Sequence, residues 1–177
     1  MIPQEIIKLL PGLRLDLTAK EIGPASNRYN CIMHVIGGRL PNIWPTESKP
    51  IDVDVMGVKT FWPTDLSNDD SLETFISLFK KFKYDICDDE SYDSKYRKIA
   101  IFCKKGTNIV THASLQKDEA IWTSKLGQSI LIQHLLYSIE GDAYGTVRCF
   151  MRRPVTITKE FDQSVIWKYL EQLKSKS

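Results

Sequence analysis

The sequence predicts an α+β domain in which helices pack against an antiparallel sheet. Three strand-like runs, 98–103, 109–115 and 120–124, are separated only by short polar turns. A further strand-like run covers 144–151. The clearest helix, 71–82, has apolar residues at helical spacing, namely Leu72, Phe75, Ile76, Phe79 and Phe82. Because short turns join antiparallel neighbours, we expect a sheet of at least four strands with helices packed on it.

Two short helices are predicted in the first forty residues. The first covers 3–10 and ends at Pro11-Gly12. The second begins at Cys31 and ends at Gly37-Gly38, a pair suited to a C-terminal cap. No helix or strand is predicted in residues 13–28, which look irregular, or in residues 39–70, which are rich in proline and tryptophan.

Two further helices are expected in the C-terminal third. One covers about 128–140. The other covers 163–175, is capped by Asp162, and carries an apolar stripe made of Val165, Ile166, Tyr169, Leu170 and Leu173. Burial of these apolar side chains would stabilise the protein, so we expect the helix to dock on the domain through this stripe. We therefore divide the chain into a single α+β domain, 1–160, and a docked C-terminal helix, 161–177.

Composition narrows the classes of function. Hydrophobic residues make up 42% and charged residues 26% of the 177 positions, and the net charge is +2. These values are typical of a globular protein and indicate no nucleic-acid partner, and the small basic cluster near the C-terminus is expected to be solvated surface. No apolar run reaches the roughly 18 residues of a membrane span. Without a basic and apolar leader, we expect a cytoplasmic protein, or one delivered without a classical signal peptide.

Four cysteines and three histidines occur without the spacing of a metal site, so we expect no metal and no cofactor. Cys31 differs from the other three cysteines because it stands at a predicted helix start, where the helix dipole favours the thiolate. The other three, Cys87, Cys103 and Cys149, are expected to be shielded or electrostatically disfavoured. Cys31 is therefore the candidate nucleophile, and it should be the most reactive thiol of the four.

His112 is the candidate general base for Cys31, since an imidazole from a strand placed beside the helix would complete a Cys–His pair. If the hairpin turns around Lys117-Asp118, position 112 faces about 122–124, which nominates Thr123 or Ser124 to orient the ring. His34 is a rival base on the same helix as Cys31. His134 lies on an apolar helical face and is expected to be a core residue.

Four other residues are candidates for substrate contact. The backbone N–H of Cys31 needs a second donor to form an oxyanion hole, and Asn27 and Asn30 are near in sequence. Lys125 either binds substrate or pairs within the fold. Trp62, in the proline- and tryptophan-rich segment, either packs over the Cys31 helix or lines a substrate groove.

Several motifs together resemble a family of small bacterial domains of unknown function. They are Tyr29-Asn30-Cys31-Ile32, Phe61-Trp62-Pro63, Lys98-Ile99-Ala100, Thr111-His112-Ala113, Trp122-Thr123-Ser124-Lys125-Leu126-Gly127, Ile132-Gln133-His134 and Tyr144-Gly145. The resemblance covers roughly 15–152 and is most specific in the run from Trp122 to Gly127. The chain departs from the family pattern at Met33-His34, where the family has Ala-Trp.

The order of a helical cysteine followed by a sheet histidine is similar, at the level of the fold, to papain-like and NlpC-type cysteine hydrolases. The resemblance implies a papain-like arrangement, with an N-terminal helix carrying the cysteine and an antiparallel sheet carrying the histidine. It also implies hydrolysis or transfer at an amide or thioester, as in a peptidase, amidase or deamidase, with a peptide or protein substrate. The alternative is a non-catalytic protein-binding module on the same fold, in which the cysteine and histidine are buried and inert.

Overall fold

The centre of the fold is an antiparallel sheet of seven strands with the order β1-β9-β8-β7-β6-β10-β5. This computed structural model describes all residues except 39–40, 46–50, 54–58 and 175–177. The strands are β1 (Lys20–Gly23), β5 (Asp85–Cys87), β6 (Tyr96–Cys103), β7 (Val110–Gln116), β8 (Ile121–Lys125), β9 (Leu131–Leu135) and β10 (Thr146–Pro154). The α+β class and the antiparallel sheet are thus confirmed.

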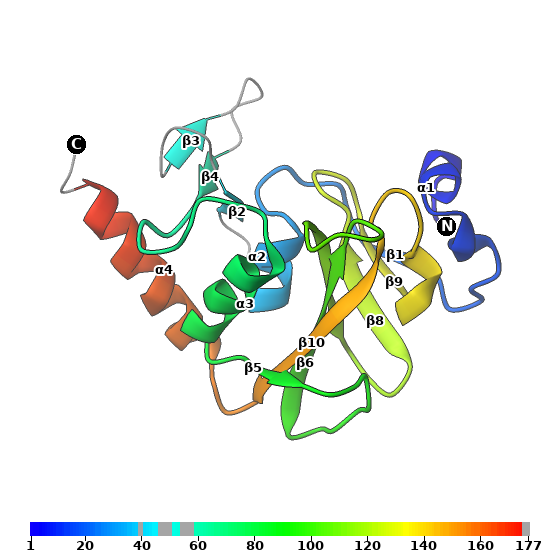
Figure 1. Cartoon of the computed structure of the whole chain (residues 1–177). Coiled ribbons are helices and arrows are strands. Elements are labelled where there is room, and N and C mark those ends of the chain that lie inside the picture. The colour runs from blue at the N-terminus through cyan, green and yellow to red at the C-terminus, as the bar shows by residue number, and fades with distance from the viewer. Residues whose placement is uncertain (39–40, 46–50, 54–58, 175–177) are drawn as a thin grey trace.

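Helices flank the sheet on both sides. The α-helices are α1 (Gln4–Leu9), α2 (Cys31–Ile36), α3 (Leu72–Lys81) and α4 (Lys159–Lys174), with short 3-10 helices η1 (Pro11–Arg14) and η2 (Leu136–Ile139). In Figure 1, α2, α3 and α4 lie on one side of the sheet and α1 lies at the opposite end of the molecule. The prediction that an N-terminal helix carries the cysteine is wrong, because α1 precedes α2 and Cys31 belongs to α2.

Local signals at both ends define α2. The Asn30 side chain caps its start, where Oδ1 accepts a hydrogen bond from the Met33 N–H at 3.2 Å. Gly37 ends it in the left-handed conformation with φ of 109°, which glycine adopts without steric cost. The Gly37 and Gly38 N–H groups both donate to the Met33 carbonyl at 3.0 Å. The N-cap at Asn30 therefore makes Cys31 the first residue of α2.

Each face of the sheet is covered by its own hydrophobic core. We call the core under α2, α3 and α4 the first core; it includes Cys31, Val35, Phe75, Phe79, Ile99, Ile101, Ala113 and Met151. The second core lies on the other face, toward α1, and includes Ile6, Leu10, Leu13, Ala100, Phe102, Trp122, Ile132 and Leu136. Neighbouring residues of β6 alternate between the two cores, as expected for a strand buried on both faces.

The predicted helix over 128–140 is wrong. Those residues form strand β9, which lies between β1 and β8, and the short helix η2. In its pairing with β8, Leu135 lies opposite Ile121 and Leu131 lies opposite Lys125. A short, mainly apolar segment fits a buried strand as well as a helix, so periodicity alone does not separate them. Gly127, with φ of 55°, lies in the turn that joins the two strands.

Four strands lie in segments where no strand was predicted. β1 lies in 13–28 and pairs with β9, for example Lys20 with Gln133. The other three are β2 (Asn42–Ile43), β3 (Ile51–Val53) and β4 (Lys59–Phe61). They form a separate small sheet of order β2-β4-β3, which is seen above α2 in Figure 1. Strands of two to four residues are too short to produce a readable alternation.

Helix α4 begins earlier than predicted, and Asp162 lies inside it rather than capping it. Its apolar residues Val165, Ile166, Tyr169 and Leu170 pack on the first core. The Leu173 side chain, part of the expected stripe, lies outside the described residues. Asp162 forms a buried ion pair with Arg153 of β10, with the two nitrogens 2.5 and 2.7 Å from the carboxylate oxygens.

Candidate functional site

Cys31 is the first residue of α2, as predicted, but its thiol is buried. It is 5% exposed and belongs to the first core. Burial raises the pKa of the thiol to about 11, because desolvation outweighs the backbone N–H of Ala113 and the positive charge of Lys125, both of which favour the thiolate. The helix start therefore does not produce an activated thiolate in this structure.

His112 packs against the opposite face of the sheet from Cys31. Its ring stacks on Tyr144 with centroids 4.1 Å apart and meets the ring of Phe102 at 5.7 Å, within the second core. The next residue, Ala113, belongs to the first core with Cys31. Because successive side chains of a strand point to opposite faces, the sheet separates the imidazole from the thiol. Within the described residues no hydrogen bond joins them, and Nε2 of His112 has no partner.

Thr123, one of the two residues predicted to orient His112, contacts His34 instead. Its Oγ1 lies 3.0 Å from Nε2 of His34 and donates to the Leu115 carbonyl at 3.3 Å. The observed register pairs Leu115 with Thr123, so position 112 lies beyond the paired part of β8. Burial, followed by the charge of Arg97, lowers the pKa of His34 to about 4. His34 is therefore neutral at pH 7.

Ser124, the other predicted orienter, belongs to a buried chain of hydrogen bonds on the second-core side. Its Oγ lies 2.6 Å from Oγ of Ser114 and 2.8 Å from Nε2 of His134, whose Nδ1 donates to the Leu135 carbonyl at 2.7 Å. Burial lowers the pKa of His134 to about 4. With Nδ1 protonated, neutral His134 accepts from Ser124, and Ser124 in turn accepts from Ser114. The three side chains are fully buried, so no substrate reaches them here.

Lys125 joins two loops and is fully buried. Its ammonium donates to the carbonyls of Ser26, Gly127 and Ser129 at 2.7, 2.5 and 2.7 Å. It also lies 5.1 Å from the ring centre of Tyr29, next to the start of α2. Desolvation lowers the pKa of Lys125 to about 8. Because all three ammonium hydrogens are engaged, Lys125 holds the fold together rather than presenting a charge to a ligand.

The remaining predicted contacts also serve the fold. Asn30 uses both ends of its amide, since Oδ1 caps α2 and Nδ2 donates to the Ile43 carbonyl at 2.8 Å. Asn27 is exposed, and its carbonyl accepts from Asn42 at 3.4 Å. Trp62 is 3% exposed, donates to the Ser67 carbonyl at 2.9 Å, and packs its ring against Phe75. The side-chain N–H donors of Asn30 and Trp62 are thus engaged within the fold.

Three further kinds of feature would bear on function, namely a metal site, a membrane-spanning helix and an exposed basic surface. No three His, Cys, Asp or Glu side chains there are placed to hold a metal ion. Among the described helices, none combines the length and apolarity that a membrane span requires. The basic cluster near the C-terminus, Arg148, Arg152, Arg153 and Lys159, is predicted to be solvated surface. For Arg153 this is wrong, because it is 2% exposed and bound to Asp162.

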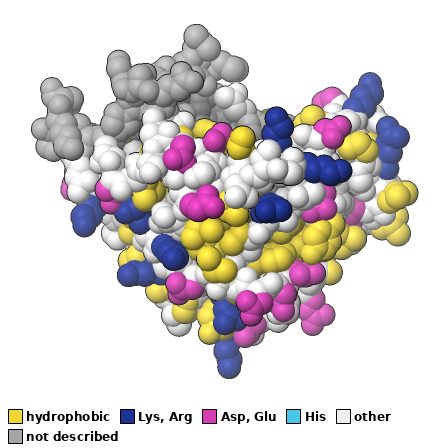
Figure 2. Space-filling model, in the orientation of Figure 1, with side chains coloured by type: hydrophobic (Ala, Val, Ile, Leu, Met, Phe, Trp, Pro, Cys, Tyr) yellow, Lys and Arg dark blue, Asp and Glu magenta, His cyan; other side chains and the backbone are white. Residues whose placement is uncertain are grey.

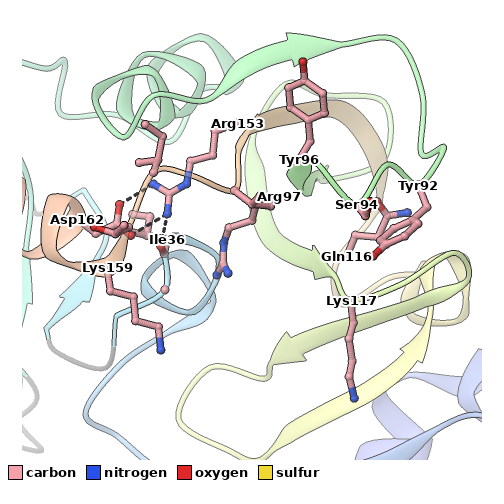
Figure 3. Close-up of a pocket in the computed structure, with 14 residues that line it drawn as sticks. Ile36, Tyr92, Ser94, Tyr96, Arg97, Gln116, Lys117, Arg153, Lys159 and Asp162 are labelled. Carbon is pink, nitrogen blue, oxygen red and sulfur yellow. Dashed lines mark hydrogen bonds and ion pairs between the residues drawn. The ribbon is translucent and has the colours of Figure 1, made fainter.

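The structure also forms a polar pocket that the sequence did not reveal. Figure 3 shows it beside the C-terminal end of α2, between the strands and the start of α4. Its charged lining residues are Arg97, Lys117, Arg153, Lys159 and Asp162. These residues come from three separate segments without a shared motif, so only the strand order brings them together.

The chain belongs to a family defined as a domain of unknown function, DUF7689, which it matches over residues 20–152. The matched range includes every predicted site residue and ends before α4. Comparison with curated proteins returns no significant match. Comparison with solved structures likewise returns none. The family assignment confirms the resemblance to a domain of unknown function and provides no link to papain-like hydrolases.

Proposed function

We propose that this chain is a non-catalytic protein-binding module. The observation that carries the proposal is the separation of Cys31 from His112, each of them buried on its own face of the sheet. A cysteine nucleophile needs thiolate near neutral pH and an imidazole within hydrogen-bond reach. With a pKa of about 11 for Cys31, only about one thiol in ten thousand is ionised at pH 7.

An apolar surface supports a binding role. In Figure 2, apolar side chains gather over the part of the sheet formed by β8 and β10. On the second core, four half-buried apolar residues keep part of their surface in solvent, namely Ala143, Tyr144, Val147 and Phe150. Tyr137 of η2 is 52% exposed. A contiguous apolar surface of this kind is typical of protein–protein contact.

Acidic residues border this apolar surface and indicate the character of the partner. Asp88, Asp89 and Glu90 are exposed, and Glu90 accepts a hydrogen bond of 3.1 Å from the Tyr137 hydroxyl. The acidic segment is thereby held next to η2. The partner that fits carries apolar side chains flanked by Lys or Arg, because opposite charges at the rim of an interface favour the correct encounter.

Limited iodoacetamide labelling of the native protein at pH 7, followed by peptide mass spectrometry, tests the proposal. We expect the half-buried Cys87 and Cys149 to label before Cys31, and His112→Ala to leave the rate at Cys31 unchanged. Circular dichroism confirms that the variant is folded, and His112→Gln serves as a second variant that keeps more of the buried volume. Labelling of Cys31 first, at a rate that falls in both folded variants, would contradict the proposal.

A Cys–His hydrolase acting on an amide or thioester is the second candidate. Two observations favour it: the backbone N–H of Ala113 supports the Cys31 sulfur, and Nε2 of His112 is buried without a partner. Unpartnered buried polar groups often belong to functional sites. This candidate requires the His112 ring to leave Tyr144 and reach the other face of the sheet, and the same labelling experiment separates it from the binding module.

A further inference from the structure

We propose that the polar pocket at the C-terminal end of α2 binds a small organic phosphate monoester. The proposal stands independently of the protein-binding function, because the pocket involves neither the apolar surface nor Cys31. The cavity has a volume of about 360 Å³ and is formed by the end of α2, residues 92–97, residues 116–117 and residues 153–162. This volume lies in the range of small-molecule sites.

The pocket carries an excess of positive charge. Arg97, Lys117 and Lys159 line it, and among the lining residues that the structure describes the only carboxylate is Asp162. That carboxylate is already bound by both terminal nitrogens of Arg153, at 2.5 and 2.7 Å. Three cations of the described lining therefore have no carboxylate partner within it. This excess of positive charge suits an anion of charge about −2, the charge of a phosphate monoester above its second pKa of about 6.

Arg97 is held in place before any ligand arrives. Its Nε donates to the Val35 carbonyl at 3.3 Å and to the Tyr84 hydroxyl at 3.1 Å, and its Nη2 donates to the Val35 carbonyl at 3.2 Å. Its Nη2 also donates to the His34 carbonyl at 3.5 Å. A planar guanidinium fixed in this way loses little conformational freedom when it binds a phosphate.

The two lysines extend toward the same side as Arg97. In Figure 3 the ends of Arg97, Lys117 and Lys159 all point away from the Arg153–Asp162 pair. Both lysines are exposed, whereas Arg97 is half-buried. The arrangement combines one fixed guanidinium with two exposed ammonium groups, and lysines bind a phosphate as point charges.

A second, partly apolar groove adjoins the pocket and offers a binding surface for the organic group of the ester. This groove has a volume of about 290 Å³ and shares Gly37, Lys159 and Asp162 with the pocket. Its other lining includes the apolar residues Ile166 and Leu170 of α4. An ester with an apolar group therefore gains contacts that inorganic phosphate lacks, because burial of apolar surface adds to the charge interaction.

Titration of the native protein with phenyl phosphate, followed by ¹H–¹⁵N NMR spectra at low salt, tests the proposal. We expect saturable shifts in residues 94–97, 116–117 and 159–162, and weaker binding of inorganic phosphate. The variant Lys117→Gln/Lys159→Gln should raise the Kd about tenfold, which corresponds to about 1.4 kcal/mol. The matched control, Lys104→Gln/Lys105→Gln, removes the same charge from an exposed turn between β6 and β7 and should leave the Kd unchanged within about twofold.

Three results would overturn the proposal. The first is a titration with phenyl phosphate that does not saturate. The second is an equal loss of affinity in the Lys104/Lys105 control, which would mean attraction by net charge rather than binding in the pocket. The third is equal affinity for inorganic phosphate and phenyl phosphate, which would remove the role of the apolar groove.

Discussion

Ser124 donates a hydrogen bond of 2.8 Å to Nε2 of His134. This bond lies on the second-core face of the sheet, whereas Cys31 belongs to the first core. His134 donates in turn to the Leu135 carbonyl, and Ser114 donates to Ser124. The two residues thus resemble a serine–histidine pair in geometry, but both are fully buried. We interpret this chain as a satisfied polar network that fixes the pairing of β7, β8 and β9.

Ser124→Ala should lower the free energy of unfolding by about 1–3 kcal/mol, because it leaves Nε2 of His134 buried without a donor. Ser114→Ala is the matched control: it removes one hydrogen bond but leaves the bond from Ser124 to His134, so its cost should be about 1 kcal/mol. Urea denaturation of both variants measures the difference. Equal stability of Ser124→Ala and the native protein would exclude a stabilising role for the network.

The Arg153–Asp162 ion pair should hold α4 on the first core. Its two side chains are almost completely buried, and Arg153 also donates to the Phe82 and Ile36 carbonyls at 2.9 and 3.2 Å. Removing one member of a buried pair costs about 3–5 kcal/mol, since the other charge stays buried. Asp162→Asn should therefore lose hydrogen-exchange protection across α4.

Glu160→Gln is the control for Asp162→Asn, because it makes the same chemical change at an exposed position in the same turn. It should leave the protection of α4 unchanged. If hydrogen exchange in α4 is equally slow in the two variants, the ion pair does not anchor the helix.

Stability should fall as the pH is lowered from about 6.5 toward 4. The pKa values of His34 and His134 are about 4 in the folded protein, against an ordinary value of 6.5. Between these values the unfolded chain binds more protons than the folded one, so acidification favours unfolding. For the fully buried His134 the loss between pH 7 and pH 5 should be about 2 kcal/mol.

The variant His134→Gln tests this origin of the pH dependence. Urea denaturation at several pH values between 5 and 7 should show a smaller slope in the variant than in the native protein, because one titrating group is removed. The buried carboxyl Asp16 does not interfere in this window. Burial alone would raise its pKa, but hydrogen bonds from Ser138 and Thr18 outweigh it, so the pKa lies below its ordinary value. Identical slopes would mean that His134 does not titrate abnormally.

The sequence predicted those parts of the fold that local signals determine. Asn30 and the Gly37-Gly38 pair define both ends of α2, and the stripe from Leu72 to Phe82 defines α3. The residues of β9 could not be assigned in the same way, because their apolar run fits a helix until pairing with β8 is known. Long-range pairing, rather than propensity, decides such segments.

The geometry of the candidate site depends on strand register, on which face of the sheet each side chain lies, and on burial, none of which the sequence pattern determined. The pattern placed His112 in a strand correctly, but not the face on which its side chain lies. A register that differs by two or more residues from the expected one moved Thr123 and Ser124 away from position 112. The burial that raises the pKa of Cys31 likewise arises from packing by distant segments.

The rate of Cys31 alkylation as a function of pH tests the central claim most directly. Iodoacetamide labelling between pH 5 and 10, read out on the Cys31 peptide, gives the apparent pKa of this thiol in the native protein. A buried, unpaired thiol should react slowly at pH 7, and its rate should still be rising above pH 9, past the free-thiol value of about 8.5. A rate that reaches its plateau below about pH 7.5, and loses that plateau in His112→Ala, would show an activated Cys–His pair and contradict the account.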